Sequence, residues 1–218
     1  MAKIPAYALS VHVDDAQVTR GDVVLAEGVS FTLKPGQALS IEGPNGVGKT
    51  SLLRMIAGLS GQEGAVSFHD GSQPVDASAL RARGLHYVGG GDGLSPLLTL
   101  GETLDFWAAL FAAPPPLVPD PLHRLGLAAY RAEPVARLST GQRRRLALAR
   151  LVIAPRPCWL LDEPFSGLDQ AGQILLLEII AQHRARGGIV MMATHESPLP
   201  DAARLTLAPA LGQAEATL

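Results

Sequence analysis

The stretch Gly43-Pro44-Asn45-Gly46-Val47-Gly48-Lys49-Thr50 decides the fold of this chain. It fits the pattern G-x-x-x-x-G-K-[ST], it follows the apolar run Ala38–Ile41, and it opens the run Thr50–Ala57, which is apolar at helical spacing. A glycine-rich turn between a strand and a helix lets successive backbone N–H groups point at one anion, and the N-terminus of the helix adds a partial positive charge. The stretch therefore predicts a phosphate-binding loop.

Within this loop the side chains have separate predicted tasks. Lys49 is expected to reach the β- and γ-phosphates of a nucleotide, and the Thr50 hydroxyl is expected to bind Mg²⁺. The alternative is a glycine-rich turn with a solvated lysine, and the flanking strand and helix make it the weaker interpretation. The predicted nucleotide-binding residues are Gly43, Pro44, Asn45, Gly46, Val47, Gly48, Lys49, Thr50 and Ser51.

A second apolar run, Trp159-Leu160-Leu161, ends in the acid pair Asp162-Glu163. The carboxyl end of a buried strand is the edge where open α/β sheets bind ligands. There Asp162 can hold Mg²⁺, usually through a water, which leaves Glu163 free to orient and deprotonate an attacking water. Two solvated loop acids are the alternative, and it is the weaker one beside a phosphate-binding loop.

Strand patterns alternate with helical patterns along the rest of the chain, so an α/β fold with a mostly parallel sheet is expected. Strands are predicted over 23–25, 29–33, 38–41, 65–68, 86–88, 158–161 and 189–193, and helices over 50–57, 141–153 and 169–186. The stretch 99–138 is helical and interrupted by prolines, with a capping box at Thr99–Glu102 and a helix start at Asp120-Pro121. We interpret it as an inserted helical lobe.

The composition excludes several classes of protein. The 218 residues fit one domain, and with 47% hydrophobic and 5% aromatic residues the core must be aliphatic. A net charge of −2 gives no basic field, so no nucleic-acid partner is expected. The single cysteine forms no internal disulfide.

No signal peptide is expected. No apolar run approaches the roughly 20 residues of a spanning helix, so a transport role needs a membrane partner.

Leu138-Ser139-Thr140-Gly141-Gln142 combines two properties. Ser139 and Gln142 satisfy a capping box, and the helix that they begin exposes N–H groups that can bind an anion. The arginines that follow (143, 144, 145 and 150) have a nucleic-acid interpretation, but the negative net charge favours a solvated helix face. His195, after the apolar run 189–193, lies at the same predicted sheet edge, and Asp169 can cap the helix after Ser166-Gly167-Leu168.

Five motifs follow one another along nearly the whole chain, at residues 43–50, 138–142, 159–164, 166–169 and 194–195. Together and in this order they resemble the nucleotide-binding subunit of an ATP-binding-cassette (ABC) transporter. The resemblance implies a P-loop ABC-ATPase fold with N-terminal antiparallel strands, a core over 1–92 and 155–218, and a helical signature lobe over 93–154. It implies ATP and Mg²⁺ as cofactors, with Glu163, His195 and Lys49 as catalytic residues and Thr50 and Asp162 on the metal.

The same resemblance implies partners. In the family the signature, here Ser139, Thr140, Gly141 and Gln142, closes on ATP held by a second subunit, and Asp169 belongs to the dimer-contact loop. We therefore expect a head-to-tail homodimer when ATP is bound. An integral membrane permease is the other expected partner, which predicts a cytoplasmic protein peripheral on the inner membrane.

The chain departs from the family pattern at two points. Gly91 stands where most members have a glutamine that contacts Mg²⁺, and a backbone carbonyl, a water or Asp92 must replace it. No aromatic residue precedes the core to stack on adenine, although the Arg20 guanidinium could stack. With the stretch 93–104, these features resemble the ATP-binding subunit of the haem exporter in bacterial c-type cytochrome maturation.

The sequence leaves three rival functions open. The chain could serve another small ABC exporter, or it could be a soluble DNA-repair or translation ATPase of the same superfamily. The latter usually carry two cassettes or a long coiled-coil or zinc insertion, and no such feature is present. A regulator that binds ATP without hydrolysis is disfavoured by the presence of Glu163 and His195.

Overall fold

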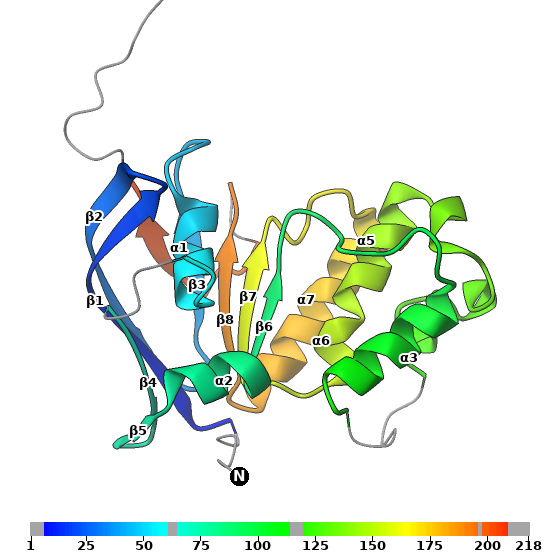
Figure 1. Cartoon of the computed structure of the whole chain (residues 1–218), viewed down its shortest axis with the longest axis horizontal. Coiled ribbons are helices and arrows are strands. Elements are labelled where there is room, and N and C mark those ends of the chain that lie inside the picture. Colours follow the sequence, from blue (N-terminus) through cyan, green and yellow to red (C-terminus); the bar gives the residue numbers. More distant parts are fainter. Residues whose placement is uncertain (1–6, 61–64, 114–119, 196–197, 209–218) are drawn as a thin grey trace, which may run out of the picture.

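The computed structural model describes residues 7–60, 65–113, 120–195 and 198–208. Figure 1 shows two sheets side by side with a helix between them, and a group of helices extending to one side. The expected parallel sheet is present as a five-stranded sheet of order β6-β7-β8-β3-β9 in the described residues. Its strands are β3 (Ala38–Glu42), β6 (Leu85–Val88), β7 (Cys158–Asp162), β8 (Ile189–Ala193) and β9 (Ala203–Thr206).

The register of the parallel sheet brings distant segments to one edge. β3 pairs with β8, and β8 pairs with β7, all in parallel, so β3 and β7 flank the same strand. Every residue of β7 and β8 is buried, which explains why both strands read as continuous apolar runs rather than alternating ones. Because the carboxyl ends of parallel strands meet at one edge, the segments after β3, β7 and β8 come together there.

The N-terminal sheet is antiparallel, as expected, and has the order β2-β1-β4-β5. It consists of β1 (Leu9–Arg20), β2 (Val23–Leu33), β4 (Val66–Asp70) and β5 (Gln73–Val75). Helix α1 (Lys49–Ile56) lies between the two sheets (Figure 1). Its apolar side chains, with those of β1, β3 and β8, form one buried core. Helix α7 (Gln170–Ala185) packs on the other face of the parallel sheet, with the helical lobe, in a second core.

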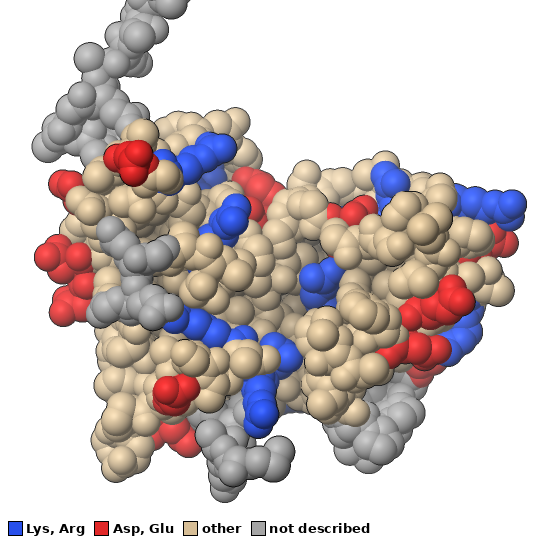
Figure 2. All heavy atoms as spheres, viewed as in Figure 1, with Lys and Arg blue, Asp and Glu red and all other residues tan. Residues whose placement is uncertain are grey.

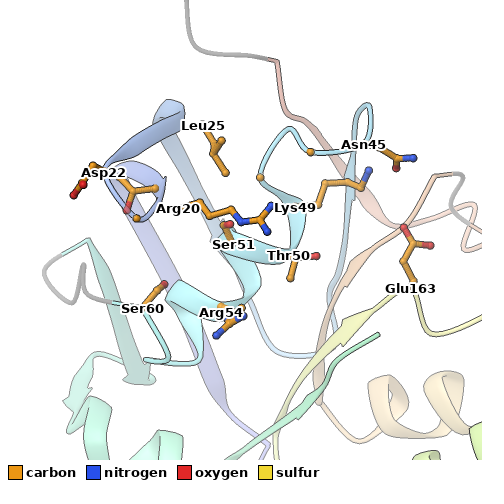
Figure 3. Close-up of a pocket in the computed structure, with 14 residues that line it drawn as sticks. Arg20, Asp22, Leu25, Asn45, Lys49, Thr50, Ser51, Arg54, Ser60 and Glu163 are labelled. Atoms are coloured by element: carbon orange, nitrogen blue, oxygen red, sulfur yellow. The ribbon is translucent and has the colours of Figure 1, made fainter. Parts of the chain in front are cut away.

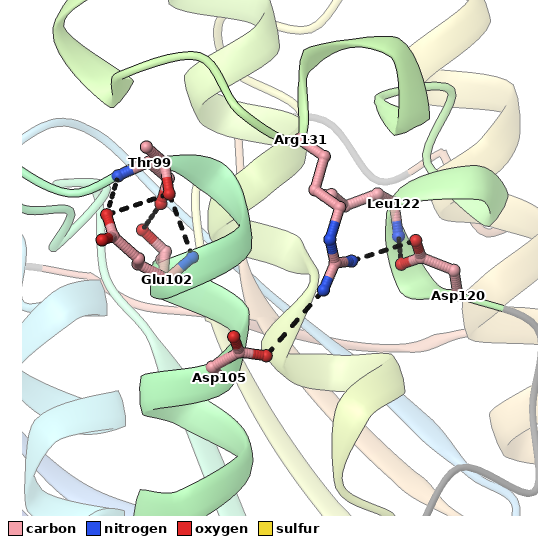
Figure 4. A network of polar contacts seen from close by, with 7 residues as sticks. Thr99, Glu102, Asp105, Asp120, Leu122 and Arg131 are labelled. Atoms are coloured by element: carbon pink, nitrogen blue, oxygen red, sulfur yellow. Dashed lines mark hydrogen bonds and ion pairs between the residues drawn. The ribbon is translucent and has the colours of Figure 1, made fainter.

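The helical lobe lies between β6 and β7 in sequence. It contains α3 (Leu100–Leu110), α4 (Pro121–Arg124), the short 3-10 turns Ala128–Tyr130 and Val135–Arg137, α5 (Thr140–Leu148) and α6 (Arg150–Ile153). The predicted capping box is confirmed, since Thr99 and Glu102 bond each other's backbone N–H at the start of α3 (Figure 4). The Asp120 carboxylate caps α4 and also accepts from Arg131, at 3.1 Å.

Several elements differ from the sequence-based expectation. The predicted strands 23–25 and 29–33 form one strand, β2, whose pairing with β1 contains register shifts. The predicted helix 141–153 begins at Thr140 and is divided into α5 and α6 at Ala149. The sequence interpretation did not identify β1, β5, β9 or the short helix α2 (Ala77–Arg83), which is capped by Asp76.

The surface carries charges of both signs. On the face shown in Figure 2, basic and acidic side chains are interspersed among uncharged residues, and the molecule is hollowed between the sheets and the helical lobe. Within the described ranges no helix is long and apolar enough to cross a membrane.

Candidate functional site

The glycine loop between β3 and α1 has the backbone shape that its sequence predicts. Gly43, Gly46 and Gly48 have φ values of 138°, 80° and 114°, which residues with a side chain rarely adopt. At Gly43 the backbone is also crowded, because a Cβ there would lie 2.7 Å from the carbonyl oxygen of Leu207. The loop thus curls tightly from the end of the sheet onto the first turn of α1.

The Lys49 side chain lies folded back over this loop. Lys49 is only 7% exposed, and its Nζ donates to the carbonyl oxygens of Gly43, at 2.7 Å, and Pro44, at 3.2 Å. A buried ammonium is costly unless its protons find acceptors. The two loop carbonyls satisfy that need here, and phosphate oxygens are the stronger acceptors that could replace them.

The site joins two segments that are far apart in sequence. The Thr50 hydroxyl, on the first turn of α1, donates to the carboxylate of Asp162 at the end of β7, with distances of 2.9 and 3.1 Å to its two oxygens. Asp162 is 6% exposed. A hydroxyl and a carboxylate in contact supply hard oxygen ligands, and Mg²⁺ prefers such ligands. The residues present therefore fit the ion that the sequence predicted.

Glu163 and His195 meet at the same edge of the sheet. Glu163 has a positive φ of 46°, an uncommon conformation for a residue with a side chain. Its backbone N–H donates to the carbonyl oxygen of Ala193 at 3.0 Å, which fixes the turn against β8. Its side chain is 34% exposed, and one carboxylate oxygen lies 3.5 Å from Nε2 of His195. The geometry therefore presents a partly solvated carboxylate, anchored through its backbone, beside an imidazole.

A cavity of about 980 Å³ opens over the glycine loop and extends toward the turn between β1 and β2 (Figure 3). Asn45, Lys49, Thr50, Ser51 and Glu163 line one part of it. The far part is lined by Thr19, Arg20, Gly21, Asp22, Leu25, Arg54 and Ser60. This part contains Arg20, which the sequence placed at the adenine position, and Leu25, Arg54 and Ser60, which carried no motif to identify them.

The residues of Leu138–Gln142 stand apart from this cavity. Ser139 caps α5 and forms the predicted capping box, since Ser139 Oγ accepts from the N–H of Gln142 and Gln142 Oε1 accepts from the N–H of Ser139. Ser139 and Thr140 are exposed. The described residues that line the cavity do not include them. Within one chain, then, the structure does not bring these residues to the phosphate loop.

Asp169 has two contacts within the chain. One carboxylate oxygen accepts from the N–H of Gly172 at 2.9 Å and so caps α7, as the sequence predicted. The other accepts from Arg145 of α5 at 2.7 Å. Nearby, the start of α5 meets the loop before α7, where a Cβ on Gly141 would lie 3.4 Å from the carbonyl oxygen of Gly167. The loop of Asp169 is therefore fastened to the start of α5.

The expectation that the arginines after Gln142 form a solvated helix face is wrong. Arg144 is 6% exposed and Arg145 and Arg150 are partly buried, whereas the Arg143 side chain is 41% exposed. Arg143 lies 3.7 Å from the Asp92 carboxylate, and Arg150 donates to the Asp92 carbonyl oxygen while its guanidinium lies over the ring of Trp107. The arginines have partners within the chain because segments packed against α5 and α6 offer carboxylates, carbonyls and a ring.

Comparison with known proteins adds independent information about the family of this chain. The model of the family described as ABC transporter matches residues 26–166, more than half of the chain. The cytochrome c biogenesis ATP-binding export protein CcmA of Bartonella henselae is 42% identical over 88% of this chain and 92% of its own. The proteins of the same name from Rhodopseudomonas palustris (strain BisB5) and Rhodobacter capsulatus are 44% and 43% identical, over 85% and 90% of this chain and 90% and 86% of theirs.

Among solved structures, a putative ABC transporter ATP-binding protein from Pyrococcus furiosus superposes with a TM-score of 0.76 over 91% of this chain and 97% of its own. At 20% identity this match supports the fold alone. The glycine loop, the acid pair after β7, the matched family model and the relatives that align along most of their length lead to one conclusion: this chain belongs to the ABC transporter family of ATP-binding, ATP-hydrolysing proteins.

Proposed function

We propose that this chain is the ATP-hydrolysing subunit of an ABC exporter that serves cytochrome c biogenesis, with haem as the exported or released cargo. The contact between Thr50 and Asp162 is the observation that carries the ATPase part, because it joins the phosphate loop to the acid pair in one site. The relatives named as cytochrome c biogenesis export proteins support the exporter part.

Each residue of the site has a proposed task. The backbone N–H groups of residues 43–51 hold the phosphates, and Lys49 exchanges its two loop carbonyls for phosphate oxygens. Thr50 and Asp162 would hold Mg²⁺, which when bound neutralises charge on the phosphates. Glu163, partly solvated, orients and deprotonates the attacking water, and His195, 3.5 Å away, holds the geometry of that water and the γ-phosphate.

A second copy of the chain would complete the site. Ser139, Thr140, Gly141 and Gln142 begin a helix whose exposed start stands apart from the cavity of its own chain, so a head-to-tail homodimer is the arrangement that lets them contact ATP. Closure of this dimer on ATP would shift a membrane permease between two conformations. Because the chain has to contact such a partner, we place it at the cytoplasmic face of the membrane.

Replacement of Glu163 by Gln tests the ATPase mechanism. The amide is isosteric with the carboxylate but cannot accept the proton, so we expect turnover to fall about 10²-fold or more while ATP binding persists. Size-exclusion chromatography with light scattering should then show an ATP-dependent dimer. Glu178→Gln, which removes an exposed carboxylate from α7, is the matched control. Wild-type turnover in Glu163→Gln would remove Glu163 from the role of base.

The cargo needs a test of its own. In a bacterium that lacks its own cytochrome c biogenesis ATP-binding export protein, this chain should restore covalent haem in c-type cytochromes, provided that it pairs with the host permease. Lys49→Ala should fail to restore it. The permease from the same source is then expressed together with the chain in that bacterium. If c-type cytochromes are still not restored although the purified chain hydrolyses ATP, the proposed cargo is refuted and the ATPase assignment stands.

A further inference from the structure

Arg144 of α5 makes contacts that the proposed reaction does not use. Its Nη2 donates to the carbonyl oxygens of Asp162, at 3.1 Å, and Glu163, at 2.7 Å. Its Nη1 donates to the carbonyl oxygens of Gly89, at 3.0 Å, and Gly90, at 3.5 Å. One side chain of the helical lobe thus binds the backbone of the predicted catalytic acid and the backbone of the glycine segment after β6.

The guanidinium is suited to this position in two ways. It is planar and carries donors on both terminal nitrogens, so it can serve two pairs of carbonyls at fixed angles. Burial lowers the pKa of Arg144, and the nearby carboxylates of Asp162, Asp92 and Glu163 favour its charged form and so offset part of that lowering. A buried cation that is hydrogen-bonded and surrounded by acids is held firmly in place.

The glycine segment explains why the contact runs through the backbone. Gly89, Gly90 and Gly91 all lack side chains. Asp92 is engaged elsewhere, since its carboxylate lies 3.7 Å from Arg143 and accepts from the N–H of Leu94. The segment therefore has no side chain between 89 and 91 with which to connect the two lobes, but its carbonyls are open to Arg144.

We propose that Arg144 is a positioning residue that holds the Glu163 carboxylate at its working place and couples that place to the orientation of the helical lobe. When α5 moves, the guanidinium moves the carbonyls of Asp162 and Glu163 and those of Gly89 and Gly90 together. The inference rests on the proposed function, because it assigns a consequence to the location of Glu163. It requires no contact between Arg144 and the nucleotide.

The prediction for Arg144→Ala is a loss in kcat without an equal loss in ATP binding. A misplacement of about 1 Å at a reacting group can reduce a rate about 10²-fold, so we expect kcat to fall about 10- to 100-fold. The KM for ATP should change less than about threefold, because Lys49 and the glycine loop do not contact Arg144. The rate is normalised to folded protein by titration with a fluorescent ATP analogue.

Two further measurements separate positioning from a merely structural role. Arg144→Lys keeps the charge but offers one nitrogen instead of a fork, so its kcat should lie between those of the wild type and Arg144→Ala. Millimolar methylguanidinium should restore kcat several-fold in Arg144→Ala and leave the wild type unchanged. Arg137→Ala is the control, because Arg137 is 75% exposed and contacts only Glu133, at 3.5 Å, among the contacts of the described residues.

The outcomes are distinct. The inference is overturned if folded Arg144→Ala has the same kcat as the wild type, or if only its KM for ATP changes. The proposed function is unaffected in that case, because the wild-type chain still hydrolyses ATP. A loss in Arg144→Ala that methylguanidinium does not reverse and that Arg144→Lys shares in full also overturns it. A wild-type chain that binds ATP without turnover overturns the proposed function, and the inference falls with it.

Discussion

His86 gives the molecule a sensitivity to acid whose size can be worked out. Its ring lies in β6, is 2% exposed, donates from Nε2 to the carbonyl oxygen of Ala154 at 2.9 Å, and meets Phe111 edge-on. Burial, against the bond to Ala154, lowers the pKa of His86 to about 3, from 6.5. The ring is therefore neutral in the folded protein near neutral pH.

The sign of the effect follows from proton binding. Between pH 6.5 and pH 3 the unfolded chain binds a proton at His86 and the folded chain does not, so acid favours unfolding. At pH 5 the loss from this one residue is about 2 kcal/mol, and it approaches about 5 kcal/mol below pH 3. A domain stability of about 5–15 kcal/mol makes the loss at pH 5 easy to measure.

His86→Gln isolates this contribution, because the amide can keep the bond to Ala154 but does not titrate. Urea unfolding, followed by tryptophan fluorescence from pH 8 to pH 5, gives the free energy of unfolding for both proteins. The wild type should lose about 2 kcal/mol more than the variant between pH 8 and pH 5. Subtracting the variant's free energy of unfolding from that of the wild type at each pH removes the contributions of the other titrating groups. One of these is His183, whose pKa burial lowers to about 4. Parallel curves would refute the reasoning.

Three further predictions concern the cavity. Gly43→Ala should weaken ATP binding and lower the free energy of unfolding by about 1–3 kcal/mol, because φ is 138° and the new Cβ would meet the Leu207 carbonyl. Calorimetry measures the ATP affinity, and urea unfolding measures the stability. Gly71→Ala, with a φ of 59° but no atom within 4 Å of the new Cβ, is the control for the cost of a positive φ without a clash. An unchanged affinity in Gly43→Ala would count against a rigid loop. GTP should compete measurably with ATP in the wild type, and Arg20→Tyr should tighten ATP binding about 2- to 10-fold through ring stacking. A wild type that ignores GTP would contradict this.

The sequence predicted the features whose cause is local. The glycine loop, the capping boxes at Thr99 and Ser139 and the cap at Asp169 each depend on residues three or four positions apart, and the structure contains all of them. β7 and β8 were equally clear, because strands buried on both faces need an unbroken apolar run.

What the sequence did not predict depends on contacts between distant segments. Arg144 serves carbonyls of residues 89, 90, 162 and 163, and a carbonyl is present at every residue, so no pattern marks the pairing. β1 was missed because register shifts near Asp14 and Asp15 interrupt its alternation of buried and exposed residues. Arg54, Leu25 and Ser60 enter the cavity only through the folding of α1 against the antiparallel sheet.

The contacts of Lys49 and Thr50 have a consequence for how fast the site can empty. The two side-chain donors that a departing ADP and phosphate would leave behind, the Lys49 ammonium and the Thr50 hydroxyl, already have acceptors in Gly43, Pro44 and Asp162. Departure therefore leaves the buried Lys49 ammonium hydrogen-bonded, which reduces the energetic cost of emptying the site. Both side chains can therefore exchange one set of acceptors for another when a ligand leaves.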